Sequence, residues 1–344
     1  MPVFAFSTSD VHSTIPFWKT CLWEPETTSL LAPDLVPETV VGKVYLLKGK
    51  QAEDTYSADR SKSQKVPLHD LRDMEDKPNL ETDGFTYVSG WHINGIEDMV
   101  EFSEEHRAAL EADSVELVKE LTGAKSAYTY SMYFRDHTSP NAPKSAPVIH
   151  SDMSPEGAEY MKGVARKVFL TSPDPMEIRF GKYMREGKNI AIFNVWRPIC
   201  TVEDNHLGLC NWRSLVKEDA VNFNIKPHNG LSSAQAWKYR EGQQWFYLSK
   251  QQPNEAFVFM QHDSRAPDGH GINVPHASFK LKKDAGKPPT RMSFEARVVA
   301  ILGTPTDPPI EPPIGGRLSE FHTYMLSGIN HVINRIIPTS YIDV

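Results

Sequence analysis

The stretch Ala146-Pro-Val-Ile-His-Ser-Asp-Met-Ser-Pro-Glu-Gly-Ala-Glu159 contains the one place in the chain where an acidic residue stands two positions after a histidine, His150-Ser151-Asp152. On a β-strand, side chains two residues apart project from the same face, so His150 and Asp152 would lie side by side. Such a pair supplies two of the three ligands in the 2-His-1-carboxylate triad that binds non-haem Fe(II). The spacing alone carries little weight, because 13 histidines and 44 acidic residues in 344 positions produce it about twice by chance.

The segments around this pair predict a fold rich in strands. Short runs of β-branched and aromatic residues bounded by turn residues predict strands at 43–48, 84–89, 128–134, 188–198, 244–249, 255–260, 274–279 and 291–302. Apolar spacing predicts one or two amphipathic helices between Ile96 and Leu121, and Ser154 before Pro155 predicts a helix that reaches about Val168. Strands and helices do not alternate regularly, as a parallel sheet would require. The sequence therefore favours a mainly β fold with flanking helices, and the strand count fits a double-stranded β-helix, or jelly roll.

Changes in composition along the chain suggest three parts. Residues 1–83 are expected to form an N-terminal extension packed on the core, residues 84–302 the jelly-roll core, and residues 303–344 a proline-rich linker with a C-terminal helix. The apolar residues of that helix recur at three- and four-residue intervals, at Leu318, Phe321, Met325, Ile329, Val332 and Ile336. Such a stripe packs either on its own chain or on another subunit, so a homodimer through this helix is one of two open interpretations.

Composition excludes several classes of partner and compartment. The net charge of −7 is spread without long single-sign runs, which argues against a nucleic acid or an anionic membrane as partner. Cys21, Cys200 and Cys210 are few and not in a Cys-x-x-Cys spacing, so they indicate plain thiols in a reducing compartment. The N-terminus lacks the pattern of a signal peptide, and no apolar run approaches the roughly 18 residues of a membrane span. We therefore expect a cytoplasmic protein.

A triad needs a second histidine from a distant strand. The candidates are His206, His228, His262, His270 and His276. We prefer His276, because it opens the strand-like segment Ala277-Ser278-Phe279 and is followed at strand distance by Arg291. His262 is the strongest rival, although its Gln-His-Asp-Ser setting is more typical of a strand that ends in a loop.

Arginines near the predicted triad suggest an anionic cosubstrate. Three protein ligands leave three positions on octahedral iron; a 2-oxoacid can fill two of them and O2 the third. The distal carboxylate of the oxoacid then needs a guanidinium, whose planar fork suits it. On the strand at 291–302, Arg291, Ser293, Glu295 and Arg297 share one face. A solvated strand face would look the same, and Arg197, which ends the strand at 188–198, could equally be a buried salt-bridge partner.

Several blocks taken together resemble a known family. The chain carries, in this order, His150-x-Asp152, Phe193-Asn-Val-Trp-Arg-Pro198, Gln244-Trp-Phe-Tyr-Leu-Ser-Lys-Gln-Gln-Pro-Asn-Glu255, His276-Ala-Ser-Phe279 and Arg291-Met-Ser-Phe-Glu-Ala-Arg297. This set resembles a fungal family of hydroxylase/desaturase enzymes that includes the gibberellin desaturase, over roughly residues 84–302. The resemblance implies an Fe(II)- and 2-oxoglutarate-dependent oxygenase that acts on a small molecule of specialised metabolism, with O2 as co-reactant. It implies His150, Asp152 and His276 as metal ligands and Arg291 as the first choice for 2-oxoglutarate, with Arg197 and Arg297 as alternatives.

Other functions stay open at this point. A degenerate relative could keep the jelly roll and bind a ligand without redox chemistry, and an isomerase or hydrolase could use the same metal ligands without 2-oxoglutarate. Some relatives carry a methyltransferase label, but the chain has no strand-flanked glycine-rich loop for an adenosyl cofactor. Hydroxylation, desaturation and oxidative rearrangement begin with the same hydrogen abstraction, so the residues do not distinguish among them. Tyr128, Tyr130 and Tyr133 either line a substrate pocket or simply pack.

Overall fold

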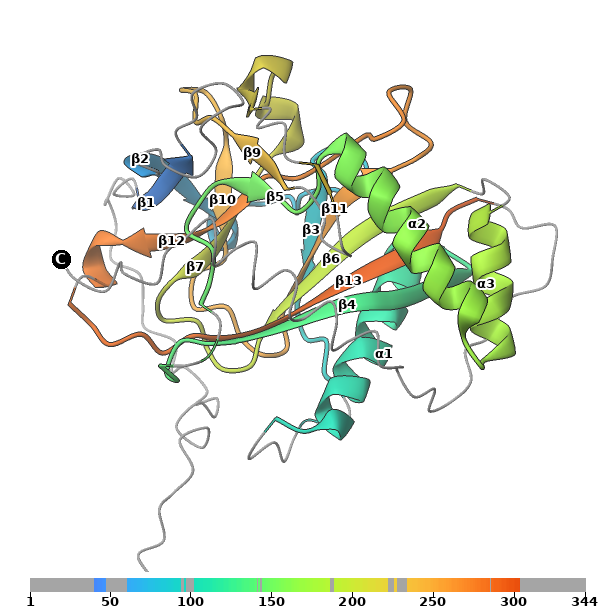
Figure 1. Ribbon diagram of the computed structural model, residues 1–344. Coiled ribbons are helices and arrows are strands. Elements are labelled where there is room, and N and C mark those ends of the chain that lie inside the picture. The colour runs from blue at the N-terminus through green and yellow to red at the C-terminus, as the bar shows by residue number, and fades with distance from the viewer. Residues whose placement is uncertain are drawn as a thin grey trace, which may run out of the picture.

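The computed structural model describes residues 40–47 and 61–303, apart from 94–95, 97–101, 141, 143, 186–188, 222–225, 228–233 and 285. The proline-rich linker, the expected C-terminal helix and His228 lie outside these residues. Within them the chain forms two β-sheets and three α-helices (Figure 1). None of the described helices has the length and apolar character needed to cross a membrane.

The first sheet has five antiparallel strands in the order β3-β11-β6-β13-β4. Their bounds are β3 Phe85–Val88, β11 Ala256–Asp263, β6 Ile190–Pro198, β13 Met292–Ile301 and β4 Ser126–Asp136. The central strand β6 is buried along its whole length, and its side chains alternate between the two faces. Trp196 faces the second sheet, whereas Phe193 and Val195 pack against α1 (Glu104–Thr122). We call the first of these the inner face and the second the outer face.

The second sheet has eight strands in the order β1-β2-β10-β7-β12-β5-β9-β8. Their bounds are β1 Val40–Leu47, β2 Ser61–Asp70, β10 Trp245–Tyr247, β7 His206–Cys210, β12 His276–Leu281, β5 His150–Ser151, β9 Gln235–Trp237 and β8 Ala220–Val221. The pairing of β10 with β2 is parallel and the other pairings are antiparallel. β1 and β2 fall within the expected N-terminal extension, yet they are strands of this sheet.

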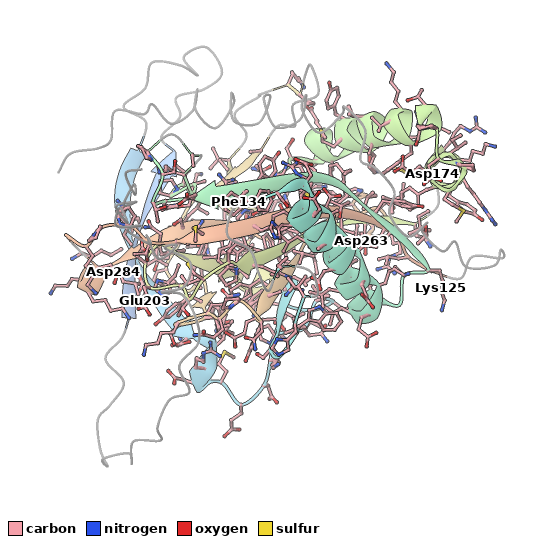
Figure 2. The ribbon with its side chains drawn as sticks, turned by 90° about the horizontal axis from the view of Figure 1, so that it is seen from below. Lys125, Phe134, Asp174, Glu203, Asp263 and Asp284 are labelled. Atoms are coloured by element: carbon pink, nitrogen blue, oxygen red, sulfur yellow. The ribbon has the colours of Figure 1, made fainter. Side chains whose placement is uncertain are left out.

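The helices cover the five-stranded sheet from both sides. α1 lies against the outer face, and Figure 2 shows it running across the sheet, with Lys125 and Phe134 marking the course of β4. α2 (Pro155–Thr171) and α3 (Pro175–Arg185) cover one end of the inner face, where Tyr128 packs on Phe169 and Phe180. At the other end the inner face packs on the eight-stranded sheet through the aromatic residues Trp196, Phe257, Phe259 and Phe246. The site described below lies in this second region.

The predicted fold class is confirmed: the chain is mainly β, with two facing sheets and helices that flank them. α1 ends at Gly123, whose φ of 66° is the left-handed conformation that glycine adopts readily. α2 begins as predicted, with Ser154 accepting a hydrogen bond from the Gly157 amide and Pro155 in the first turn. The sequence interpretation did not identify α3, β2 or β7.

Candidate metal centre and adjoining pocket

The side chains of His150, Asp152 and His276 meet where β5 and β12 pair. His150 and His276 are direct partners in the antiparallel register, and their ring centroids are 4.4 Å apart. Asp152 follows β5 by one residue, and its Oδ1 lies 3.9 Å from His150 Nε2. One potential ligand atom from each residue lies within 4.8 Å of the others, so a single cation could contact all three.

Both histidines are oriented by main-chain carbonyls. His150 Nδ1 lies 2.8 Å from the Val148 oxygen, and His276 Nδ1 lies 3.2 Å from the Val274 oxygen. Because a carbonyl oxygen can only accept, each Nδ1 carries the proton and donates it. Each Nε2 therefore keeps a free lone pair, which is the state that a metal ligand requires.

Burial favours the neutral form of both imidazoles. It lowers the pKa of His150 to about 4, helped by the neighbouring His276, and it also lowers the pKa of His276. Burial alone would raise the pKa of the Asp152 carboxyl, but the Arg297 guanidinium and the two imidazoles hold it well below its usual range. The trio thus offers two neutral nitrogens and one carboxylate near neutral pH, which is the donor set expected for non-haem iron.

Asp152 is held from the opposite sheet. Its Oδ1 forms an ion pair of 2.5 Å with Arg297 Nη2, its Oδ2 accepts a hydrogen bond from Asn194, and its backbone N–H donates to Gln261 Oε1 at 2.7 Å. Asn194, Gln261 and Arg297 lie on β6, β11 and β13, so three strands of the five-stranded sheet hold one residue that follows β5. Arg297 is therefore bonded to a candidate ligand.

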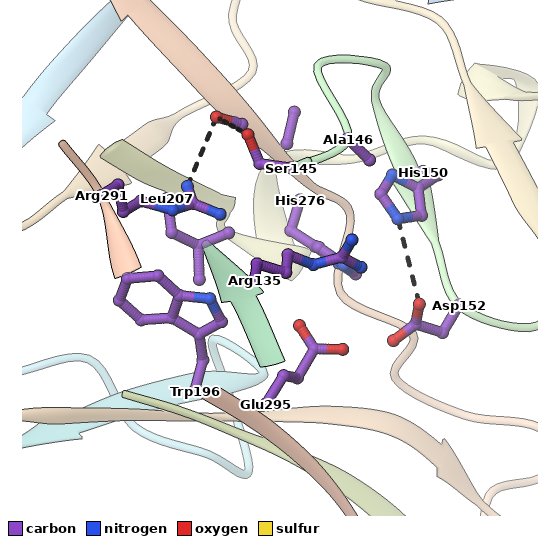
Figure 3. A pocket seen from close by; sticks show the side chains of 12 residues that line it. Arg135, Ser145, Ala146, His150, Asp152, Trp196, Leu207, His276, Arg291 and Glu295 are labelled. Carbon is purple, nitrogen blue, oxygen red and sulfur yellow. Dashed lines mark hydrogen bonds and ion pairs between the residues drawn. The ribbon is translucent and has the colours of Figure 1, made fainter. Parts of the chain in front are cut away.

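A pocket adjoins the trio (Figure 3). Besides the trio, its lining includes Trp196, Leu207, Ser278, Arg291, Arg135 and Glu295. Arg291 immediately precedes β13 and is 2% exposed. Its guanidinium donates from Nη1 to the Asn205 carbonyl and lies over the Trp196 ring, 5.3 Å from the centroid, with Ser278 Oγ 3.4 Å from Nη1.

Arg291 has no carboxylate in direct contact among the described residues, although the charges of Asp204 and Glu295 act on it from farther away. Among the described residues it forms no ion pair, and its Nε is buried without a hydrogen-bond partner. Burial lowers the pKa of Arg291 to about 9, with the nearby Arg135 acting in the same direction. A buried cation without an ion-pair partner is costly, so an anion in the pocket would be stabilised next to Arg291 as the described residues place it.

The other predicted residues are not brought to the pocket. Arg197 points to the outer face, where its Nη2 forms a buried ion pair with Asp113 of α1. His206 packs edge-on against Tyr247 at 5.4 Å. His262 Nδ1 lies 3.1 Å from His270 Nδ1, so these two histidines pair with each other and neither joins the trio.

Sequence reasoning missed Arg135 and the residues that hold Asp152. Arg135 lies opposite Ser293 in the β4–β13 register, and Tyr133 lies opposite Glu295, so strand parity could have placed Arg135 on the inner face. Asn194 stands directly opposite Arg297 on β6. No local signal in the sequence could have identified Asn194 or Gln261 as partners of Asp152, because the contacts join two different sheets.

Comparison with known proteins agrees with this geometry. The family model described as oxidoreductase/YMDC permease-like domain matches residues 37–301.

The hydroxylase/desaturase CTB9 of Cercospora beticola is 27% identical over 257 residues, 67% of this chain and 74% of that protein. The alpha-ketoglutarate-dependent dioxygenase phiK of a fungal species is 28% identical over 254 residues, 69% and 83% of the two chains. The Gibberella fujikuroi GA4 desaturase of the gibberellin cluster is 28% identical over 122 residues, 33% of this chain and 35% of that protein. The resemblance to fungal hydroxylase/desaturase enzymes is thus confirmed.

A solved structure supports the fold. The iron- and alpha-ketoglutarate-dependent endoperoxidase NvfI aligns with a TM-score of 0.60 at 20% identity, over 78% of this chain and 100% of that one. The jelly-roll prediction is thereby confirmed for the core.

Proposed function

The chain belongs to the oxidoreductase/YMDC permease-like family, and from that premise we propose that it is an Fe(II)- and 2-oxoglutarate-dependent oxygenase. It would oxidise a C–H bond of a small organic molecule. The observation that carries the proposal is the combination of three converging ligand atoms with a buried, unmatched guanidinium in the adjoining pocket. A metal-dependent isomerase or hydrolase would need the first feature but not the second.

The donor set fits Fe(II). His150 and His276 would each present Nε2, because the proton of Nδ1 is already donated to a carbonyl. Asp152 would supply the carboxylate oxygen. Bound there, the metal would provide the redox chemistry that couples 2-oxoglutarate decarboxylation by O2 to substrate oxidation.

Arg291 is our choice for the distal carboxylate of 2-oxoglutarate. Its two rivals already have partners, since Arg197 pairs with Asp113 and Arg297 with Asp152. Arg291 combines near-complete burial, a place in the pocket wall and, among the described residues, no ion pair. An arginine–carboxylate contact there would cancel the charge and fix the cosubstrate by paired hydrogen bonds.

The substrate class and reaction outcome rest on the relatives. The printed names of the relatives include hydroxylase/desaturase and alpha-ketoglutarate-dependent dioxygenase, which supports a small-molecule substrate in fungal specialised metabolism. Hydroxylation, desaturation and oxidative rearrangement are all compatible with this proposal. Arg135 and Glu295, which line the pocket beyond Arg291, would face that substrate or the cosubstrate.

The decisive experiment separates metal binding from cosubstrate binding. Metal-free protein is loaded anaerobically with Fe(II), and 2-oxoglutarate is then added while the visible spectrum is recorded. A weak charge-transfer band that needs both components is expected, followed by succinate release when O2 is admitted, with loss on chelation and recovery on adding Fe(II). Normal turnover of an identified substrate in buffer free of metal and 2-oxoglutarate would refute the proposal. Metal-dependent turnover without succinate would favour the isomerase or hydrolase.

We also propose a cytoplasmic location and a homodimer that forms through residues 318–336. Cys210 is a buried free thiol, which suits a reducing compartment. Sedimentation of the full chain beside a Phe321→Asp variant tests the dimer. Equal masses for the two proteins at micromolar concentration would argue against association through this segment.

A further inference from the structure

Arg297 and Asn194 form a clamp on the carboxylate of Asp152. They are direct cross-strand partners on β13 and β6. Each takes one oxygen: Arg297 Nη2 lies 2.5 Å from Oδ1, and Asn194 donates to Oδ2. With both oxygens held, the carboxylate plane cannot turn freely about the Cβ–Cγ bond.

The clamp itself is fixed in place. The Arg297 guanidinium lies over the Tyr133 ring, 5.1 Å from its centroid, and the side chains of Arg297 and Asp152 are 4% and 6% exposed. Burial would lower the pKa of Arg297, but the charge of Asp152 raises it, so the pair stays ionised. A buried pair of this kind is rigid, because either partner alone would be an uncompensated charge.

A third contact joins the clamp to the second histidine. Gln261 accepts from the Asp152 amide at 2.7 Å and donates to the Val274 carbonyl at 3.1 Å. The same Val274 carbonyl orients His276. The five-stranded sheet therefore sets the relative position of two ligands that the eight-stranded sheet carries.

We propose that Arg297 is a positioning residue for the metal, which with Asn194 fixes the orientation in which Asp152 presents its carboxylate. This inference rests on the proposed metal site. It removes Arg297 from the residues expected to bind 2-oxoglutarate, since its charge is taken by Asp152 and it lies six residues from Arg291, about 20 Å along an extended strand.

Charge and position predict opposite effects on metal affinity, which makes the proposal testable. If Arg297 acted only through its charge, its removal would leave the negative charge of Asp152 unbalanced and strengthen cation binding. If it positions Asp152, its removal should weaken binding by about 10–100-fold, as is typical when an outer partner of a metal ligand is lost.

The experiment is an anaerobic Co(II) titration of the metal-free full chain, followed by the visible bands of the bound ion. Arg297→Met is expected to weaken Co(II) binding by about 10–100-fold and to change the bands, and Arg297→Lys to recover part of the affinity. Arg291→Met is the matched control: it removes another buried guanidinium, one that lines the pocket beside the trio and does not contact Asp152, and it should keep both the affinity and the bands.

Each outcome decides one question. Unchanged or tighter Co(II) binding in Arg297→Met, or an equal loss in Arg291→Met, overturns the inference. Should Arg297→Met fail to fold, Arg297→Lys and Asn194→Ala carry the test, and wild-type affinity with wild-type bands in both would overturn it. Failure of the wild-type protein to bind Co(II) or Fe(II) would instead refute the proposed function, so the two failures are distinguishable.

Discussion

The two faces of the five-stranded sheet each bury arginines, but they balance the charges differently. On the outer face, Arg197 pairs with Asp113 of α1, and Asp113 also accepts a hydrogen bond from Trp91 Nε1 at 2.7 Å. On the inner face, Arg297 pairs with Asp152, whereas Arg291 has no carboxylate partner among the described residues. The source of the balancing charge thus distinguishes the three arginines. Arg197 joins a helix to the sheet, Arg297 holds a candidate metal ligand, and Arg291 is available to bind an anion.

This difference explains why burial alone is a poor guide to function. Arg197 is 0% exposed and Arg291 is 2% exposed, so the two are equally inaccessible. The charge of Arg197 is balanced by Asp113, although its Nε and Nη1 have no hydrogen-bond partner among the described residues. Of these two arginines, Arg291 lacks an ion-pair partner among the described residues, and Arg291 rather than Arg197 lines the pocket.

The largest effect is expected from the ligands on the inner face. His150→Ala, Asp152→Ala or His276→Ala should each reduce metal affinity and turnover by more than about 100-fold, because a three-ligand site has no redundancy and even outer partners contribute 10–100-fold. His262→Ala is the control, since His262 is buried against His270 away from the trio. Equilibrium metal binding provides the measurement. Retention of iron and turnover in His276→Ala, with loss in His262→Ala, would mean that His262 is the third ligand.

The next effect concerns cosubstrate affinity. Arg291→Ala should raise the KM for 2-oxoglutarate tens-fold or more with metal binding preserved, because losing a desolvated charge pair typically costs about 2–5 kcal/mol. Arg197→Met, on the other face, should leave this KM unchanged. Steady-state succinate formation at varied 2-oxoglutarate provides the measurement, and a normal KM in Arg291→Ala would transfer the role to another residue.

A stability effect without a catalytic one is expected on the outer face. Arg197→Met leaves Asp113 as a buried lone charge and should lower the free energy of unfolding by about 3–5 kcal/mol. The double variant Arg197→Met/Asp113→Leu should recover most of that loss, because both charges are then gone. Urea unfolding curves of the three proteins test this, and a double variant as unstable as the single one would contradict the assignment of the pair as structural.

The smallest effect separates the pH dependence of stability from that of activity. Burial raises the pKa of Glu111, on α1, from its ordinary 4.5 to about 8. The folded state therefore binds a proton that the unfolded state has lost, and stability should fall as pH rises from about 4.5 to 8. Glu111→Gln should flatten that dependence without altering the pH profile of turnover. Urea midpoints between pH 5 and 8 provide the test, and an unchanged slope in the variant would exclude Glu111 as the cause.

Part of this site could be predicted from strand geometry and part could not. Alternation on the final strand correctly grouped Arg291, Ser293, Glu295 and Arg297 on one face, because side-chain parity is a local property of a strand. Parity did not show which face of β6 carries Arg197, since that strand is apolar on both sides. Asp113, the partner of Arg197, is 84 residues away from it in the sequence, so no local pattern connects the two.

The missed elements have equally physical causes. β7 is only five residues long, and its stability comes from pairing with β10 and β12 rather than from its own sequence. β2 holds Lys65 and Gln64 among few apolar residues, so it lacks the run of β-branched residues that marks β6. Tyr130 and Tyr133 are packed in the core against α2 and α3, whose position the sequence does not indicate.

The carbonyls of Val148 and Val274, each two residues before its histidine, bear on how the site tolerates mutation. Main-chain oxygen is present whatever amino acid occupies the position, so no single substitution at Val148 or Val274 deletes the acceptor itself. The backbone conformation therefore keeps the proton of each imidazole on Nδ1, whatever side chains surround it. The side chains that line the pocket around Arg135 and Glu295 can change without affecting this. A lineage could therefore exchange one substrate for another, by changing side chains alone, without passing through ancestors that had lost their metal.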